Sequence, residues 1–198
     1  MMEVFAKIVS VAMLSVFVQN AIFDRALGAN VVIYASRKNI HIIGFTLGIT
    51  AMTTVASCIS FFFDSIVLPT KFGYLFMPLI YVGIISVLYI LALLLFWRFF
   101  PKTFAKIKKY VHLAIVNCTV IGALFLNSGY GNDIWSYIGY GFGTGIGFFL
   151  ACLLLNIAHE KLDSEKIPRV FRGYPIMLIY IGIISLAFYT LVGYTADF

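Results

Sequence analysis

The sequence has 198 residues, of which 62% are hydrophobic and 11% are charged, and its mean hydropathy is +1.01. Soluble domains carry about 25% charged residues, so this composition excludes a water-soluble enzyme with one apolar core and predicts an integral membrane protein. The net charge of +6 does not indicate nucleic acid as a partner, because the basic residues stand in short loops between apolar runs.

The apolar runs predict an all-α integral membrane protein with a single membrane domain, residues 1–198. The chain begins with Met1-Met2-Glu3, which lacks the basic region of a signal peptide, so we expect the first apolar run to be retained. A membrane-spanning helix needs about 20 apolar residues. Six runs approach or exceed this length: 4–23, 40–63, 75–97, 110–127, 134–157 and 174–194.

The first of these runs is less regular than the others. Asp24 and Arg25 interrupt it, and residues 26–35 are again mostly apolar but only about half as long as a span. This pattern predicts a broken helix with a re-entrant half, which membrane proteins tolerate only where protein buries the freed backbone groups.

The basic residues predict the orientation of the chain. Twelve of the fourteen Lys and Arg residues follow the first, third or fifth span, and only Lys7 and Lys71 lie on the other side. Because Lys and Arg accumulate on the cytoplasmic side, both termini are expected outside a bacterial-type cytoplasmic (inner) membrane. The lipid bilayer is then one partner, and the basic loops face anionic lipid or cytoplasmic subunits.

The chain contains an internal duplication. Asn20 recurs 97 residues later as Asn117, and Leu79–Ser86 recurs in similar form as Leu178–Ser185. Each copy holds three spans, an odd number, so the second copy enters the membrane from the opposite side. The fold prediction is therefore a 3+3 inverted-topology repeat of six transmembrane helices, with a broken or re-entrant first helix in each half. The two repeats cover about 1–100 and about 101–198.

Three asparagines stand in apolar surroundings: Asn20, Asn30 and Asn117. A carboxamide in hydrocarbon costs on the order of a few kcal/mol unless it is hydrogen-bonded. We interpret Asn20 and Asn117 as structural residues near the membrane midplane that satisfy backbone groups freed by the helix breaks. Cys118 would by itself be interpreted as a small buried hydrophobe. The three cysteines lie in apolar segments without C-x-x-C spacing and do not indicate a disulfide framework.

A glycine-rich run, Gly139 to Gly147, superficially matches a dinucleotide-binding fingerprint. It lies within a predicted span and lacks the βαβ context, so we reject that interpretation. Small residues four apart allow helices to approach closely. Helix packing is favoured over a backbone that lines a cofactor or ion path for Gly44, Gly48, Gly141, Gly143, Gly145 and Gly147.

Ionisable residues fall mostly at span ends, and a carboxylate proton relay within this chain is therefore not predicted. The acidic residues at these ends are Asp64, Asp133 and Glu160. His41, His112 and His159 are also placed there and are interpreted as interfacial polar residues rather than metal ligands.

Four blocks carry a resemblance to a known family: Asn20-x7-Gly28, Ala35–Lys38, Asn117–Gly122 and Tyr140–Gly147. They resemble the paired six-helix membrane subunits of Rnf and Na⁺-translocating NADH:quinone reductase (Nqr) complexes, and the segment from Glu160 onward is similar to the RnfA/NqrE type. The resemblance implies further complex subunits, among them a sister six-helix membrane subunit. It also implies an intramembrane [2Fe–2S] cluster to which each of the two sister subunits contributes two cysteines.

One residue departs from the family pattern. Cys118 matches the cysteine of the second half, whereas the first-half motif Leu-Gly-x-Cys reads Leu27-Gly28-Ala29-Asn30. An amide is a poor substitute for a thiolate at iron. Either the cluster has an altered ligand set, or the chain is a paralogue that has lost it.

Two functions remain as expectations. The favoured one is a membrane subunit of an Rnf/Nqr-like electron-transport complex that translocates Na⁺ or H⁺, with no catalysis by the chain alone. Cys118 would then be a cluster ligand, and Asn30 would occupy the position of the missing one. The alternative is a cluster-free paralogue that acts as a small-solute or ion transporter or as an assembly scaffold.

Overall fold

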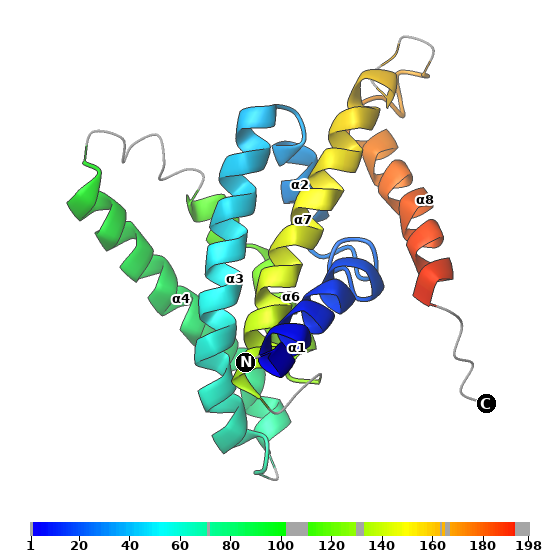
Figure 1. The fold of residues 1–198 in the computed structure, drawn as a ribbon. Coiled ribbons are helices and arrows are strands. Elements are labelled where there is room, and N and C mark those ends of the chain that lie inside the picture. The colour runs from blue at the N-terminus through cyan, green and yellow to red at the C-terminus, as the bar shows by residue number, and fades with distance from the viewer. Residues whose placement is uncertain are drawn as a thin grey trace.

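The computed structural model describes residues 2–70, 72–101, 111–129, 133–162, 164 and 167–192, and all regular secondary structure in these residues is helical (Figure 1). In chain order the helices are α1 (Met2–Met13), the π-helical turn η1 (Leu14–Val18), α2 (Ala29–Ala35), α3 (Asn39–Val67), α4 (Gly73–Phe99), α6 (Cys118–Asn127), α7 (Ile134–Leu162) and α8 (Tyr174–Val192). A helical segment over 111–115 precedes α6.

Three of these helices are long and apolar enough to cross a membrane. They are α3 over His41–Val67, α4 over Gly73–Phe99 and α7 over Ile134–His159. The predicted spans 40–63, 75–97 and 134–157 lie within them. The spans predicted over 110–127 and 174–194 correspond to shorter apolar segments, Val111–Asn127, which is interrupted at residues 116–117, and Tyr174–Thr190; residues 110, 193 and 194 lie outside the described residues.

The first predicted span, 4–23, is shorter in the structure. Its helix continues into the π-helical turn η1 and ends at Val18, so α1 and η1 together cover residues 2–18. The chain then makes turns until α2 begins at Ala29. The helix therefore ends before Asn20. The carboxamide of Asn20 then makes hydrogen bonds to backbone groups that a continuing helix would have satisfied itself.

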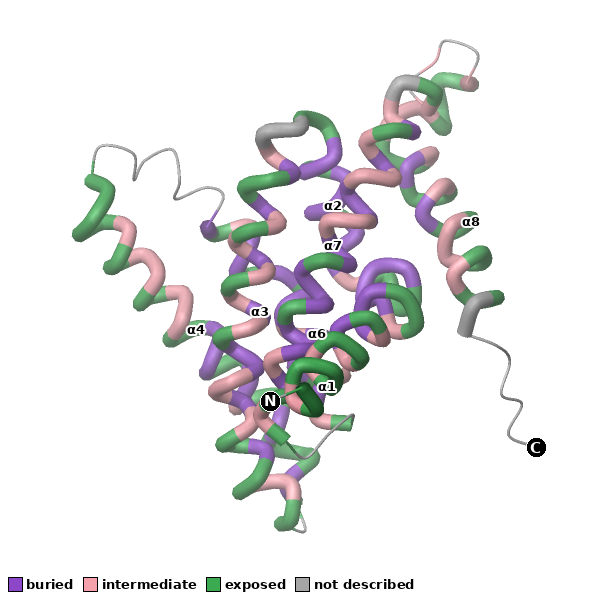
Figure 2. The backbone as a smooth tube through the Cα atoms, viewed as in Figure 1, coloured by how far each residue is buried: buried purple, intermediate pink, exposed green. Residues whose placement is uncertain are grey.

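The outer helices carry an apolar surface. α4 exposes large apolar side chains over most of its length, Leu75, Leu79, Leu91 and Trp97 among them, and α8 exposes Ile183 and Leu186 (Figure 2). Soluble monomers rarely expose contiguous apolar patches larger than a few hundred Å². A membrane provides the apolar environment that such a surface requires, and the chain is a membrane protein.

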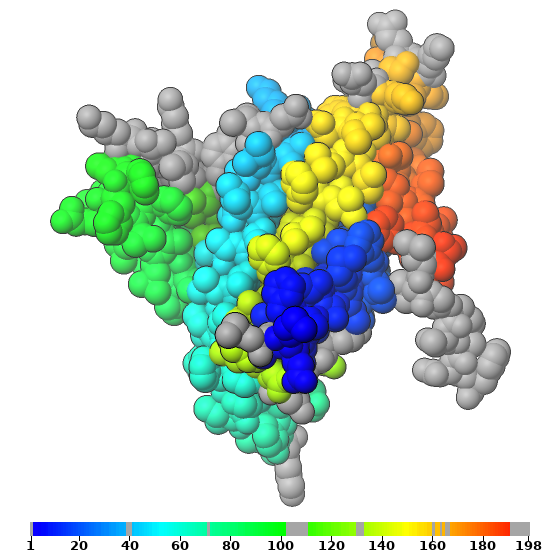
Figure 3. All heavy atoms as spheres, viewed as in Figure 1, coloured from blue at the N-terminus to red at the C-terminus, as the bar shows by residue number. Residues whose placement is uncertain are grey.

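The centre of the molecule is the packing of α3 along α7, which is the most extensive contact between described elements. Glycines of α7 make this approach possible. A Cβ at Gly141 or Gly145 would meet α3 at Thr53 or Thr50, and one at Gly143 would meet α1 at Ala12. Figure 3 shows the N-terminal helix lying across α7. The missing side chains thus let α7 pack against two neighbours at backbone distance.

Of the two α3 glycines in the predicted packing set, Gly48 alone has a close neighbour among the described residues. A Cβ at Gly48 would lie 3.1 Å from Cβ of Ala114, whereas a Cβ at Gly44 would meet no described atom within 4 Å. Helix packing at Gly44 therefore stays a prediction. That residue lines an apolar groove of about 390 Å³ between α3, α4 and the segment before α6, because α4 diverges from α3 (Figure 1).

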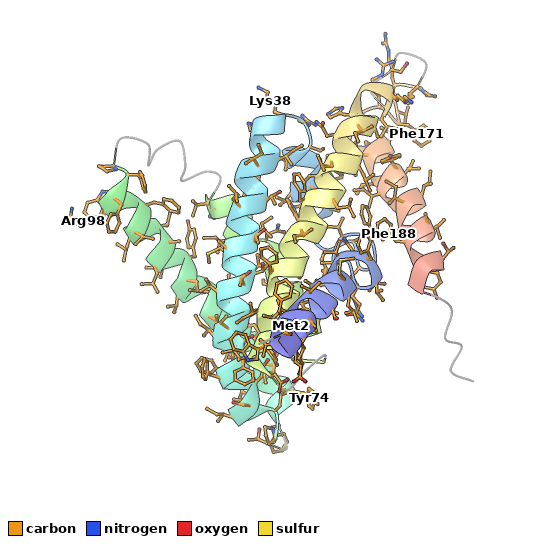
Figure 4. All side chains as sticks on the ribbon, in the orientation of Figure 1. Met2, Lys38, Tyr74, Arg98, Phe171 and Phe188 are labelled. Carbon is orange, nitrogen blue, oxygen red and sulfur yellow. The ribbon has the colours of Figure 1, made fainter. Side chains whose placement is uncertain are left out.

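Two basic residues that follow predicted spans lie toward the same end of the molecule. Figure 4 places Lys38, Arg98 and Phe171 toward one end of the molecule, and Met2 and Tyr74 toward the other. The first three residues belong to the segments that follow the first, third and fifth predicted spans. Lys38 and Arg98, from two of the basic segments predicted to face the cytoplasm, therefore lie toward the same end.

We predict that Gly141→Ala lowers the thermal unfolding midpoint of the purified protein. The new Cβ would lie 2.8 Å from the carbonyl oxygen of Thr53 and 2.9 Å from Cα of Thr54, which are backbone atoms that cannot move aside independently. Overpacking of this kind costs about 1–3 kcal/mol. Gly44→Ala is the matched control, because it adds the same methyl group in open space. Equal midpoints for the two variants would contradict the packing described for α7.

Candidate functional site

The first helix break is organised by the side chain of Asn20, which is 1% exposed. Its Oδ1 accepts hydrogen bonds from the backbone N–H groups of Ile22 at 3.0 Å and Phe23 at 3.3 Å. Its Nδ2 donates to the carbonyl oxygens of Val16 at 2.8 Å and Gly147 at 3.4 Å. One carboxamide thus serves backbone groups on both sides of the break and also ties the break to α7.

The second helix break lies at Val116 and Asn117, between the helical segment 111–115 and α6. Asn117 has an extended backbone and caps α6, because its Oδ1 accepts from the N–H of Thr119 at 3.2 Å. This is the usual way in which asparagine satisfies one of the free N–H groups at a helix start. The Nδ2 of Asn117 is buried and has no partner among the described residues.

The two breaks contact each other. The hydroxyl of Thr119 donates to the carbonyl oxygen of Leu27 at 3.1 Å, and Leu27 packs where a Cβ on Gly122 would lie. Gly28 has φ +77°, and a Cβ there would lie 2.8 Å from Oδ1 of Asn117. Gly28 therefore supplies both the left-handed backbone and the space that the contact needs. We call this contact between residues 27–28 and 117–119 the break junction.

Asn30 and Cys118 stand beside the break junction, at the starts of α2 and α6. Cys118 is the first residue of α6 and Asn30 is the second residue of α2, and both are exposed. The Oδ1 of Asn30 accepts a hydrogen bond from the N–H of Val31 at 2.9 Å. The structure thus brings the starts of both helices to one place, with one thiol and one amide at its surface.

Comparison with known proteins identifies the family of this chain. The model of the family described as Rnf-Nqr subunit, membrane protein, matches residues 8–195. The chain belongs to the Rnf-Nqr membrane subunits. The resemblance inferred from the four sequence blocks is confirmed.

Curated relatives of this Rnf-Nqr protein are matched over nearly its whole length. It is 29% identical over 176 residues to the A component of the ion-translocating oxidoreductase complex of Actinobacillus pleuropneumoniae serotype 5b, covering 89% of this chain and 91% of that protein. It is 30% identical to the protein of the same description from Azoarcus sp., covering 90% and 92%. It is 27% identical to the A component of the Na⁺-translocating ferredoxin:NAD⁺ oxidoreductase complex of Acetobacterium woodii, covering 88% and 91%.

The donor set of this Rnf-Nqr protein does not fit a contribution of two cysteines to an iron–sulfur cluster. Among the described residues Cys118 is the one exposed thiol, whereas Cys152 is fully buried in the core of α7 and Cys58 is half-buried on α3. The amide oxygen of Asn30 is already engaged by a backbone N–H. Thiolates are the usual ligands of such clusters, and Cys118 alone supplies a thiol beside the break junction among the described residues.

Sequence reasoning missed a second polar centre, around Asp64. This residue lies near the end of α3, as expected, and it is only 2% exposed. Its carboxylate accepts hydrogen bonds from the hydroxyls of Tyr81 and Tyr137. The only available signal was the aspartate at the end of an apolar run, because the two tyrosines are 17 and 73 residues away.

We predict that Asn20→Ala destabilises the protein by about 2 kcal/mol or more, because it leaves several buried backbone groups without partners, each worth about 1–3 kcal/mol. The measurement is the thermal unfolding midpoint in detergent. Asn30→Ala is the matched control, since it removes the same carboxamide from an exposed position. A loss for Asn30→Ala as large as that for Asn20→Ala would contradict the role of Asn20 in the first break.

Proposed function

We propose that this chain is the A-type component of an ion-translocating, electron-transporting oxidoreductase complex in a bacterial-type inner membrane, and that it acts only with other subunits. The observation that carries the proposal is the family match over residues 8–195, together with relatives described as the A components of such complexes. The proposed partners are the other complex subunits, including a sister six-helix membrane protein. Asn20 and Asn117 brace the two helix breaks near the midplane.

We further propose that the chain is one membrane domain built as a 3+3 inverted repeat, with halves of about 1–100 and 101–198. Three features support this. Asn20 and Asn117, which are 97 residues apart, stand at the two helix breaks, and the breaks touch through the hydroxyl of Thr119. The equivalent helices α3 and α7 pack together at the centre. Their followers α4 and α8 lie on opposite sides of that pair (Figure 1).

For the cofactor, we propose that any iron–sulfur cluster held at the break junction takes one thiolate from this chain, that of Cys118, and none from the Asn30 position. A second candidate function is a cluster-free paralogue that works as a small-solute or ion transporter or as an assembly scaffold. Asn30 is the specific observation that favours it, because the family pattern has cysteine at that position.

The deciding experiment measures iron, acid-labile sulfide and the EPR spectrum after reduction, on the chain purified with and without its membrane partners. The electron-transport function predicts iron and a cluster signal in the assembled complex, and Cys118→Ser should abolish that signal. Cys58→Ser is the matched control and should leave it unchanged. Absence of iron from every preparation would reject the electron-relay role and select the cluster-free function.

The proposed orientation, with both termini outside, is tested by labelling with a membrane-impermeant maleimide. In a variant without native cysteines, Gly129→Cys should react in intact cells, because this exposed residue follows α6 on the proposed outer side. Arg98→Cys should react only after the cells are opened, because it lies near the end of α4 among basic segments. Labelling of Arg98→Cys in intact cells would refute the orientation.

A further inference from the structure

A buried carboxylate lies at the opposite end of α3 from its basic N-terminal side. Asp64 is 2% exposed. Its Oδ1 accepts a hydrogen bond from the hydroxyl of Tyr81 at 2.9 Å, and its Oδ2 accepts one from the hydroxyl of Tyr137 at 2.8 Å. The three residues come from α3, α4 and α7, and both tyrosines are buried.

This carboxylate has no cationic partner among the described residues, where ion pairs join Lys7 to Asp133 and Arg25 to Asp24. An unpaired buried charge is strongly unfavourable. The two tyrosine hydroxyls that donate to its separate oxygens stabilise the ionised carboxylate, whereas burial opposes it. An ionised carboxylate at this depth then requires a positive charge beside it. In membrane proteins, ionisable groups held within spans mark ion or proton paths.

A pocket gives access to Asp64. Its volume is about 270 Å³, and its lining includes Asp64, Tyr137, Ser65 and Ser128. It therefore offers carboxylate, phenol and hydroxyl oxygens to an occupant. These are the ligands that hard cations prefer. The hydroxyl of Tyr137, which lines the pocket and donates its proton to Asp64, keeps oxygen lone pairs with which it can bind a cation.

We propose that Asp64 and Tyr137, with Tyr81 holding the carboxylate in place, form a binding site for one dehydrated monovalent cation, Na⁺, which enters from the side opposite the basic segments. The single carboxylate balances one positive charge, and a divalent ion would leave a net charge buried. The site lies apart from the break junction and uses none of its residues. The proposal rests on the proposed function only in the choice of Na⁺ among monovalent cations.

The test uses the purified full-length chain in detergent, with NaCl compared with choline chloride at equal concentration. A ligand that binds only the folded state raises the unfolding midpoint, and we expect a rise of about 3 °C or more at saturating Na⁺. Equilibrium dialysis with radioactive sodium should show one specific site per chain. Asp64→Asn should abolish both effects, and Tyr137→Phe should weaken the apparent affinity on the order of tenfold.

Asp133→Asn is the matched control, because it removes an exposed carboxylate from the start of α7 and should keep the Na⁺ response. A wild-type midpoint that is independent of Na⁺, with no retained sodium, overturns the proposal. An Asp64→Asn variant that keeps the full Na⁺ response also overturns it. Should Asp64→Asn not fold, the Tyr137→Phe affinity decides: an unchanged value refutes the site.

These outcomes are separable from those of the proposed function. Sodium binding is measured on the isolated chain, and Cys118→Ser should leave it unchanged. Failure to bind Na⁺ would leave the iron, sulfide and EPR results standing. Conversely, a chain without a cluster that still binds Na⁺ through Asp64 would retain this inference and favour the transporter candidate.

Discussion

The structure depends on one constraint: inside a membrane, backbone groups freed by a helix break must find partners within the protein. Asn20 meets this requirement with four hydrogen bonds, and Asn117 meets it by capping α6. Because both amides are at breaks that also touch each other, the interruption of two apolar segments creates a small polar region inside an apolar fold. Cys118 is placed by that region, since it is the first residue after the cap.

A second requirement is that the helices around the breaks come close enough for these bonds to form. Glycines on α7 provide this closeness toward α1 and α3, and hydroxyls fill part of the interface. Thr53 donates to the carbonyl oxygen of Gly141 at 2.7 Å, and the hydroxyls of Ser15 and Thr144 lie 3.1 Å apart. Such bonds between helices replace part of the hydrophobic driving force that lipid removes. The interface between α3 and α7 ends near Asp64, whose neighbours are two tyrosines rather than glycines.

Much of the fold could be predicted from the residues alone, because apolar length and charge distribution are local properties of the chain. The three long helices were predicted in this way, and the break after the first span was indicated by Asp24 and Arg25. What remained hidden depends on contacts between distant segments. Gly44 and Gly48 both line the groove between α3 and α4, yet only Gly48 has a close neighbour among the described residues, Ala114, and the sequence does not distinguish the two glycines. The burial of Asp64 likewise depends on two tyrosines from other helices, and the contact of Leu27 with Thr119 joins residues 92 positions apart.

The break junction has a mechanical consequence. The carbonyl oxygen of Gly147 on α7 accepts a hydrogen bond from Asn20. Leu27 lies a few residues after Asn20 in the same loop, and its carbonyl oxygen accepts a hydrogen bond from Thr119 on α6. Gly28 has no side chain, so the two segments of the break junction pack directly against each other. Close-packed interiors transmit displacement rather than absorb it. A shift of α7 by a fraction of an ångström would therefore be passed to the start of α6, and the thiol of Cys118 would move with it.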